Sequence, residues 1–198
     1  MSRLGDLVFF RNHRTCPRWL CFLFDNRFRK LFQNPAEIMK DYVSEGDKVL
    51  DIGAGIGFFT IPIAELVGDG GCVYAADVQD KMLETIRKRA EHAHVQHRIK
   101  LHRVRADSPF LEEKVDFILA FWMVHEVPEK ALFFEALYSL LKDNGKLLIS
   151  EPKIHVTANQ FDASVHQAEQ AGFKIIDQPE IAGSMSALFS RSGANSDT

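Results

Sequence analysis

The most informative stretch of the chain is Val49-Leu50-Asp51-Ile52-Gly53-Ala54-Gly55-Ile56-Gly57-Phe58-Phe59-Thr60. An apolar strand leads into glycines at alternating positions, and an apolar-periodic helix follows. A glycine has no Cβ, so it adopts positive φ and lets the backbone approach a ligand closely, as a nucleotide at a strand-to-helix turn requires. The spacing is G-x-G-x-G after an acidic residue, whereas the dinucleotide fingerprint is G-x-G-x-x-G, and the absence of a following Lys-Ser or Lys-Thr disfavours a P-loop.

A second acidic position closes the next expected strand, Cys72-Val73-Tyr74-Ala75-Ala76-Asp77. Asp77 lies roughly 20 residues beyond the glycines, where such folds place a ribose-binding carboxylate. A carboxylate there accepts hydrogen bonds from both ribose hydroxyls, and its charge repels a 2′-phosphate. The two motifs together predict an unphosphorylated ribonucleoside as the ligand.

Four motifs in this order resemble the class I, seven-stranded S-adenosylmethionine-dependent methyltransferases, of the small-molecule type found in quinone biosynthesis. The resemblance covers roughly residues 35 to 190 and rests on the segments 51–57, Asp77, 105–108 and 115–121. It implies S-adenosylmethionine as the cofactor and a small-molecule methyl acceptor as the partner. It also implies an α/β fold, a doubly wound, Rossmann-like, mostly parallel sheet of strand order 3-2-1-4-5-7-6 with strand 7 antiparallel and helices on both faces.

The resemblance assigns a role to each motif. The glycines shape the turn under the methionine part of the cofactor, with Asp51 near its ammonium group, and Asp77 holds the ribose. Asp107 with Ser108 resembles the position that binds the adenine amino group. Taken singly, Asp77 and Asp107 would be read as ordinary strand-end or helix-capping residues. The implied cofactor-binding residues are Asp51, Gly53, Ala54, Gly55, Gly57, Asp77, Val78, Met82, Asp107, Ser108 and Phe121.

Alternating strands and helices are expected along the chain, as in a sheet with helices on both faces. The expected strands are residues 48–52, 72–76, 100–105, 115–121, 146–150, 173–177 and 187–190. The expected helices are residues 35–43 with Asn34 as cap, 58–67, 80–93 with Asp80 as cap, 129–141 and 159–171. We expect residues 1–33 to be an extension, 34–191 the methyltransferase domain and 192–198 a frayed tail.

The loop after residues 115–121 offers candidates for a general base. His125 titrates near neutral pH and follows the strand beside which the family's substrate pocket opens, and Glu126 is its neighbour. The alternative for His125 is a capping or packing role. Trp122 and Glu151 are expected to line the substrate pocket, although Glu151 could merely end its strand.

The composition of the chain disfavours several classes of binding partner and of site. The net charge of -3 gives no electrostatic reason to expect a nucleic-acid backbone. Three cysteines are an odd number, which disfavours a disulfide framework. The sequence shows no signal peptide and no apolar run of about 18 residues. We therefore expect a cytoplasmic protein, and neither the cysteines nor the histidines have a spacing that predicts a metal site.

The segment 9–33 is basic and aromatic. Three interpretations are open: a lid over the substrate cavity with Trp19 in the pocket wall, a segment lying on an anionic membrane surface, and a nucleic-acid contact. For the whole chain, the alternatives to a small-molecule methyltransferase are an RNA or protein methyltransferase and a non-catalytic cofactor-binding scaffold. The N/D-P-P-F/Y tetrapeptide of many base-amine methyltransferases is replaced by Ala120-Phe121-Trp122-Met123.

Overall fold

The computed structural model describes residues 33–104 and 111–191, which belong to two compact units. The extension expected at 1–33, apart from Gln33, and the tail expected at 192–198 lie outside the described residues. Within the described ranges, no helix has both the length and the apolar character that crossing a bilayer would demand.

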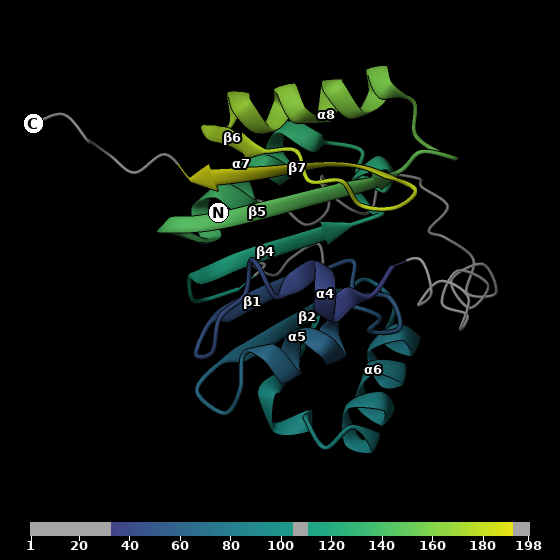
Figure 1. Ribbon diagram of the computed structural model, residues 1–198, viewed down its shortest axis with the longest axis vertical. Helices are drawn as coiled ribbons and strands as arrows, with labels where there is room; N and C mark the ends of the chain where they lie inside the picture. Colours follow the sequence, from purple (N-terminus) through teal and green to yellow (C-terminus); the bar gives the residue numbers. More distant parts are fainter. Residues whose placement is uncertain (1–32, 105–110, 192–198) are drawn as a thin grey trace, which may run out of the picture. The chain divides into compact units, whose positions relative to one another are not determined.

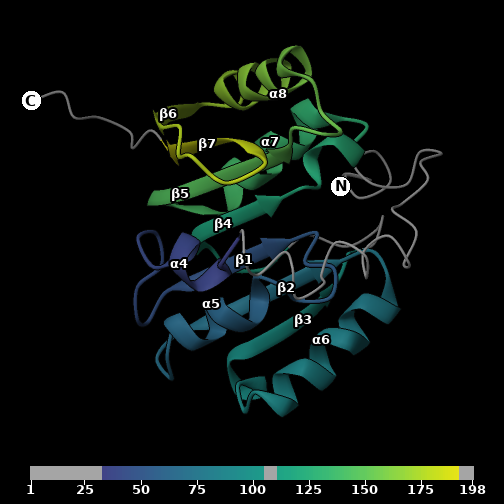
Figure 2. The same ribbon diagram turned by 45° about the vertical axis from the view of Figure 1, so that its right-hand side comes forward.

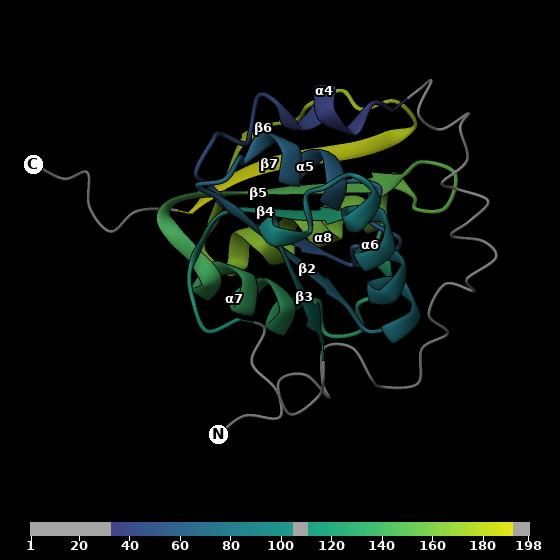
Figure 3. The ribbon, with the colours of Figure 1, turned by 90° about the horizontal axis from the view of Figure 1, so that it is seen from below.

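The first unit contains three parallel strands and the helices that pack on them (Figures 1 and 2). Strand β2 pairs with β1 in the register Lys48 to Cys72 and with β3 in the register Val73 to Ile99. Helices α5 and α6 lie next to each other, as Figure 3 shows. Its elements are α4 (Pro35–Met39), β1 (Lys48–Ile52), α5 (Thr60–Leu66), β2 (Cys72–Asp77), α6 (Asp80–His92), the 3-10 turn η1 (Gln96–Arg98) and β3 (Ile99–Arg103).

Helix α6 packs on this unit through one apolar stripe. Met82, Leu83, Ile86 and Ala90 recur at helical spacing and are buried, while charged residues occupy the opposite face. These four residues form the face of the helix that contacts the core. The helix therefore holds the chain that follows β2 against the strands.

The second unit is built around β5, which pairs in parallel with β4 and antiparallel with β7. Strand β6 pairs antiparallel with β7, and α8 packs beside both (Figures 1 and 2). Its elements are β4 (Val115–Phe121), the 3-10 turn η2 (Val124–Glu126), α7 (Lys130–Leu140), β5 (Leu141–Pro152), α8 (Ala158–Gln170), β6 (Phe173–Asp177) and β7 (Ser184–Arg191).

The strands form a seven-stranded sheet of order β3-β2-β1-β4-β5-β7-β6. This order and the antiparallel β7 confirm the predicted doubly wound, Rossmann-like fold. In such a sheet, ligands bind outside the carboxyl ends of the parallel strands. Asp51, Asp77, Phe121 and Glu151 lie within the last two residues of their strands, as expected.

Several predicted element ends were wrong. Asp80 is the first residue of α6 and not its cap; Gln79 occupies that position without a side-chain hydrogen bond, and Asp80 instead pairs with Arg103 at 3.4 Å. Helix α4 ends at Met39, although Asn34 caps it as predicted. Strand β3 ends at Arg103, and β7 begins at Ser184.

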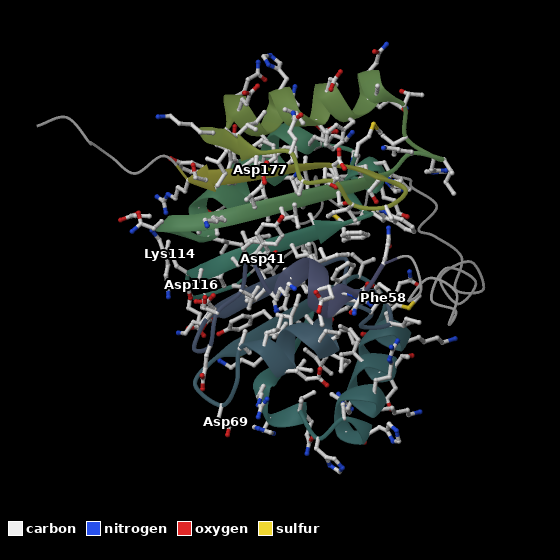
Figure 4. All side chains as sticks on the ribbon, viewed as in Figure 1. Asp41, Phe58, Asp69, Lys114, Asp116 and Asp177 are labelled. Atoms are coloured by element: carbon white, nitrogen blue, oxygen red, sulfur yellow. The ribbon has the colours of Figure 1, made fainter. Side chains whose placement is uncertain are left out.

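Strand β5 begins five residues before the predicted position 146. Residues 143–145, whose sequence Asp-Asn-Gly is typical of a turn, lie inside the strand. The register shifts there, from Val115 opposite Leu141 to Phe117 opposite Lys146. Lys142 donates to both carboxylate oxygens of Asp116 at 2.7 and 2.8 Å, which ties the irregular segment to the start of β4. Figure 4 labels Asp116 at this end of the strand.

Candidate functional site

The glycine motif forms a tight turn at the carboxyl end of β1. Gly53, Gly55 and Gly57 have φ of +73°, +55° and +82°, a region that side-chain-bearing residues rarely adopt. The backbone N–H groups of Gly53 and Ala54 donate to the carbonyl of Ala76 at 2.9 and 3.1 Å. The turn is therefore fixed to the end of β2, where Asp77 follows.

Two of these glycines differ in what surrounds them. A Cβ at Gly57 would lie 3.1 Å from Cγ1 of Ile86, so this glycine allows α6 to approach the turn closely. A Cβ at Gly55 would meet no heavy atom nearer than the carbonyl oxygen of Gly53 at 4.0 Å. The backbone at Gly55 therefore borders open space, where a ligand can approach.

Asp77 is 8% exposed and is oriented by backbone donors. Its Oδ2 accepts from the N–H of Gly55 at 2.9 Å, and its Oδ1 accepts from the N–H of Gln79 at 2.8 Å. Burial raises the pKa of Asp77, and these backbone hydrogen bonds oppose the rise. Each oxygen uses one lone pair in this way and keeps acceptor capacity for a ligand hydroxyl.

Asp51 is a buried acid, 3% exposed, whose Oδ2 accepts from Thr60 Oγ1 at 2.5 Å. Burial raises its pKa to about 7, and the charge of Asp77 adds to the rise. Within residues 33–104 and 111–191, no basic side chain forms an ion pair with it. A cationic ligand group would supply the missing positive charge, so the chemistry of Asp51 fits the ammonium that the resemblance implies there.

The remaining residues predicted to bind the cofactor differ in their burial and in the elements that carry them. Val78 is half-buried directly after β2, whereas Met82 belongs to the buried stripe of α6. Ala54 packs in a cluster with Leu83 and Ile86. Phe121 ends β4 in the second unit and is buried. The predictions for Asp107, Ser108 and Trp19 lie outside the described residues.

The second unit brings His125 and Glu151 together. Glu151 is the second-last residue of β5, and its side chain is only 2% exposed. Its Oε1 accepts from the N–H of Val124 at 2.8 Å, and its Oε2 accepts from Nδ1 of His125. The sequence singled out His125 and Glu151 separately, and it offered Glu126 as a further candidate base. Strand ends carried the signal for Glu151, yet nothing in the sequence paired it with His125.

His125 is held in a charged environment. Burial lowers its pKa, but the hydrogen bond and charge of Glu151 outweigh burial, so the pKa of His125 lies above its usual value. Glu126 also raises this pKa and Lys130 lowers it. The ring of His155 packs against the ring of His125 with centroids 4.9 Å apart. Burial lowers the pKa of Lys130, against the charge of Glu151.

Trp122 has an unusual backbone conformation, with φ of +59°. A bulky residue in this region is strained unless its surroundings fix it. Here its N–H donates to the carbonyl of Ser150 at 2.7 Å and its Nε1 donates to Ser184 Oγ at 2.9 Å. No pattern in the sequence indicates the contact with Ser184, which comes from β7 and is 62 residues away.

Among the described residues, no group of three or more His, Cys, Asp or Glu side chains gathers as metal ligands. His97, one of the histidines considered in the sequence, lies with its Nε2 3.1 Å from Oδ1 of Asp69, which also pairs with Arg98. Asp69, labelled in Figure 4, points away from the strands of its unit.

Comparison with known proteins places this arrangement in a family. Residues 43–185 match the family model described as a methyltransferase domain. The ubiquinone/menaquinone biosynthesis C-methyltransferase UbiE of Citrobacter koseri is 32% identical over 125 residues, 61% of this chain and 50% of that protein. The chain thus spans about half the length of this relative.

Two solved structures share the fold. A SAM dependent methyltransferase from Aquifex aeolicus superposes with a TM-score of 0.77 and is 22% identical in sequence. The match covers 89% of this chain and 100% of the Aquifex chain. Fibrillarin of Aeropyrum pernix, solved with natively bound S-adenosyl-L-methionine, superposes with a TM-score of 0.62 at 18% identity, over 78% of this chain and 72% of that one. Because the family model covers most of the described residues, the chain belongs to the methyltransferase domain family.

Proposed function

We propose that this chain is an S-adenosylmethionine-dependent methyltransferase that methylates a small molecule. Family membership supports the reaction class, and the name of the Citrobacter koseri relative, a quinone-biosynthesis C-methyltransferase, supports a small organic acceptor. The fold by itself would not fix the chemistry, because one fold hosts many functions. The site residues carry the proposal.

The observation that carries it is the carboxylate of Asp77, fixed by the backbone of Gly55 and Gln79 with acceptor capacity left over. Adjacent ribose hydroxyls are two donors that suit two carboxylate oxygens. The open space at Gly55 leaves room for a ligand against the backbone, and Asp51 supplies a buried acid for the ammonium group. In this assignment the glycine turn, Asp51 and Asp77 hold the cofactor, which supplies an activated methyl group on a sulfonium.

The chain's own contribution to rate is alignment and exclusion of water. Displacement at a methyl carbon needs the nucleophile about 3 Å away and in line, and positioning supplies much of the rate enhancement. Phe121 and Trp122, with ring centroids 5.5 Å apart, provide apolar surface after β4. We assign Trp122 to the acceptor pocket, as the sequence predicted.

Calorimetry with the full chain tests the proposal. S-adenosylmethionine and its demethylated product should both bind, and Asp77→Ala should weaken both by at least 10-fold, about 1.4 kcal/mol, because two charge-assisted hydrogen bonds are lost. Asp80→Ala is the matched control, since this acid lies three residues away and is exposed. Absence of binding to the wild-type protein would remove the assignment, and NAD binding instead would indicate an oxidoreductase.

Two further assignments belong to the same proposal. The odd number of cysteines supports a reducing, cytoplasmic location. We assign residues 9–33 the role of a lid over the acceptor, ahead of a membrane-surface contact. Flotation with anionic liposomes, with and without residues 1–33, separates the two: a lid predicts no flotation of either form, and flotation of the longer form alone would favour the membrane contact.

A further inference from the structure

Strand β6 is the last strand at one end of the sheet. In the order β5-β7-β6, its inner edge pairs with β7, and no other described strand lies along its outer edge (Figures 1 and 2). The outer edge of such a strand presents backbone N–H and C=O groups that can pair with a further strand. Another chain that offers a strand of its own can therefore extend the sheet here.

A β-bulge interrupts the pairing of β6 with β7. The register shifts between Ile175 and Asp177, so Ile176 is an extra residue on β6 with no opposite number on β7. The side chain of Ile176 is 49% exposed. In the part of the chain that the structure describes, Ile154 is the one other large apolar side chain that is exposed to this extent or more. The strand therefore presents apolar surface to solvent.

The bulge also brings two opposite charges onto one face of β6. Lys174 lies opposite Ser190 of β7. Asp177 lies opposite Leu188, two residues earlier on β7. Opposite residues share a face of the sheet, and so do residues two apart along a strand. Lys174 and Asp177 therefore share a face, whereas residues three apart in a regular strand point to opposite faces.

Both charges are available to a partner. Lys174 and Asp177 are exposed, and neither forms an ion pair within residues 33–104 and 111–191. Asp177, labelled in Figure 4, accepts from the N–H of Gln178 through Oδ1 at 2.8 Å. Its second carboxylate oxygen remains an acceptor for a cation.

The segment Lys174-Ile175-Ile176-Asp177 is complementary to itself when two copies run antiparallel. Lys174 of one copy then lies opposite Asp177 of the other, and Ile175 lies opposite Ile176. The two-fold axis repeats each pair, which gives two pairs of opposite charge and two apolar pairs. Cross-strand pairs of both kinds stabilise a sheet. Because Lys174 and Asp177 share a face, each charge pair forms on one side of the joined sheets.

We propose that β6 is a dimerisation edge: a second copy of this chain adds its own β6 in antiparallel orientation, about a two-fold axis between residues 175 and 176. Both copies use the same edge, so association stops at the dimer. Four residues a strand bury far less than the roughly 1,600 Å² of a standard interface, so the dimer is weak and forms at high protein concentration. The interface lies within one compact unit of each copy and does not depend on the function proposed above.

Charge reversal in the full chain tests the proposal. Sedimentation equilibrium of the wild type should fit a monomer–dimer equilibrium. Lys174→Asp and Asp177→Lys should each raise the Kd of the dimer by roughly 10-fold or more, because both charge pairs then oppose like charges. An equal mixture of the two variants should dimerise with a Kd within about 3-fold of wild type, because every pair across the axis again joins opposite charges.

Two control variants match the substitutions in chemistry. Lys153→Asp makes the same charge change at another exposed lysine of the same unit and should leave the Kd unchanged. Ile176→Ser should weaken the dimer, whereas Ile154→Ser should not, although Ile154 is the more exposed of the two.

Several results would overturn the proposal. These are a wild-type chain that stays monomeric up to its solubility limit, the same Kd in the wild type and in both charge variants, or a mixture of the variants that does not associate. A series of oligomers larger than the dimer would contradict the two-fold arrangement. If a variant fails to fold, amide hydrogen exchange of the wild type decides: exchange at residues 174–177 should slow as concentration rises, and exchange independent of concentration would refute the dimer.

Discussion

Asp51 shows how a residue that we propose to bind the cofactor can destabilise the folded protein. Its pKa rises from the ordinary 3.8 to about 7 in the folded protein, chiefly through burial. A raised pKa in the folded state means that the contribution to stability is fully present below about pH 4 and is lost as pH rises through about 7. At alkaline pH, the folded protein holds a buried charge that the unfolded chain would expose to water.

Asp51→Asn should therefore stabilise the protein at pH 8 while it weakens binding of the methyl donor. Asparagine can still accept from Thr60 but carries no charge. We expect a gain on the order of 2 kcal/mol, or roughly 5 °C in Tm, at pH 8. The gain should disappear by pH 4. Thermal unfolding followed by circular dichroism across this range measures it, and a lower Tm for the variant at pH 8 would refute the account of burial.

Substitutions at Gly57 and Gly46 distinguish the cost of backbone strain from the cost of a steric clash. Both have strongly positive φ, +82° and +88°, but a Cβ at Gly57 would lie 3.1 Å from Ile86 and one at Gly46 would meet nothing within 4 Å. Gly46→Ala should cost about 1–2 kcal/mol, the conformational term alone. Gly57→Ala should cost about 1–3 kcal/mol more, because α6 must move away from the turn. Urea unfolding gives both values; equal costs would show that the contact with Ile86 has no effect.

Single residues were predictable where one motif determined them. The glycine turn and the ends of β1 and β2 follow from local chemistry, so the positions of Asp51 and Asp77 at the strand ends could be predicted from the sequence. The pairing of His125 with Glu151 spans 26 residues and depends on how η2 meets β5. No local pattern encodes that contact, so the sequence did not predict it.

Helix α8 begins with a reciprocal cap that the sequence could have revealed. Thr157 Oγ1 accepts from the N–H of Gln160, and the Gln160 side chain accepts from the N–H of Thr157, although the predicted start was residue 159. Thr157→Ala should lower stability by about 1 kcal/mol, and Thr157→Ser should restore most of it. Thr85→Ala in the middle of α6 is the control and should be near neutral. Chemical denaturation distinguishes them; equal losses in both alanine variants would contradict the cap.

Elements were predicted best where burial is continuous. Strand β4 is an almost unbroken apolar run and matches its predicted bounds, as do β1 and β6. Prediction failed where tertiary pairing overrode a local signal: residues 143–145 read as a turn yet lie inside β5 because the strand resumes its pairing at Lys146. The acidic residue Asp80 read as a cap, but Gln79 already adopts the extended conformation that precedes the helix.

The folded chain should gain stability from its ligand. A ligand that binds only the folded state stabilises it by mass action, about 2.7 kcal/mol at 100 times Kd. The demethylated donor, S-adenosylhomocysteine, should therefore raise Tm by roughly 5–10 °C at that concentration. The same concentration of NAD should leave Tm unchanged. A dye-based melting curve checks this, and stabilisation by NAD alone would contradict the assigned ligand.

The strand order could be predicted because connection rules leave few arrangements for alternating strands and helices. The resemblance supplied the rest, including the antiparallel β7 that the sequence pattern alone does not determine. The identity of the methyl acceptor could not be predicted in the same way. Trp122, which we assign to the acceptor pocket, donates a hydrogen bond to Ser184 from a distant segment, and such a contact leaves no periodic trace in the sequence.

A crystal structure of the full chain with S-adenosylhomocysteine tests the central assignment most directly. We predict that the two ribose hydroxyl oxygens lie within hydrogen-bonding distance, about 2.6–3.2 Å, of the Asp77 carboxylate. The amino-acid portion should lie against the backbone of the glycine turn. Electron density for the ligand elsewhere, or an Asp77 side chain turned away from the ribose, would contradict the account.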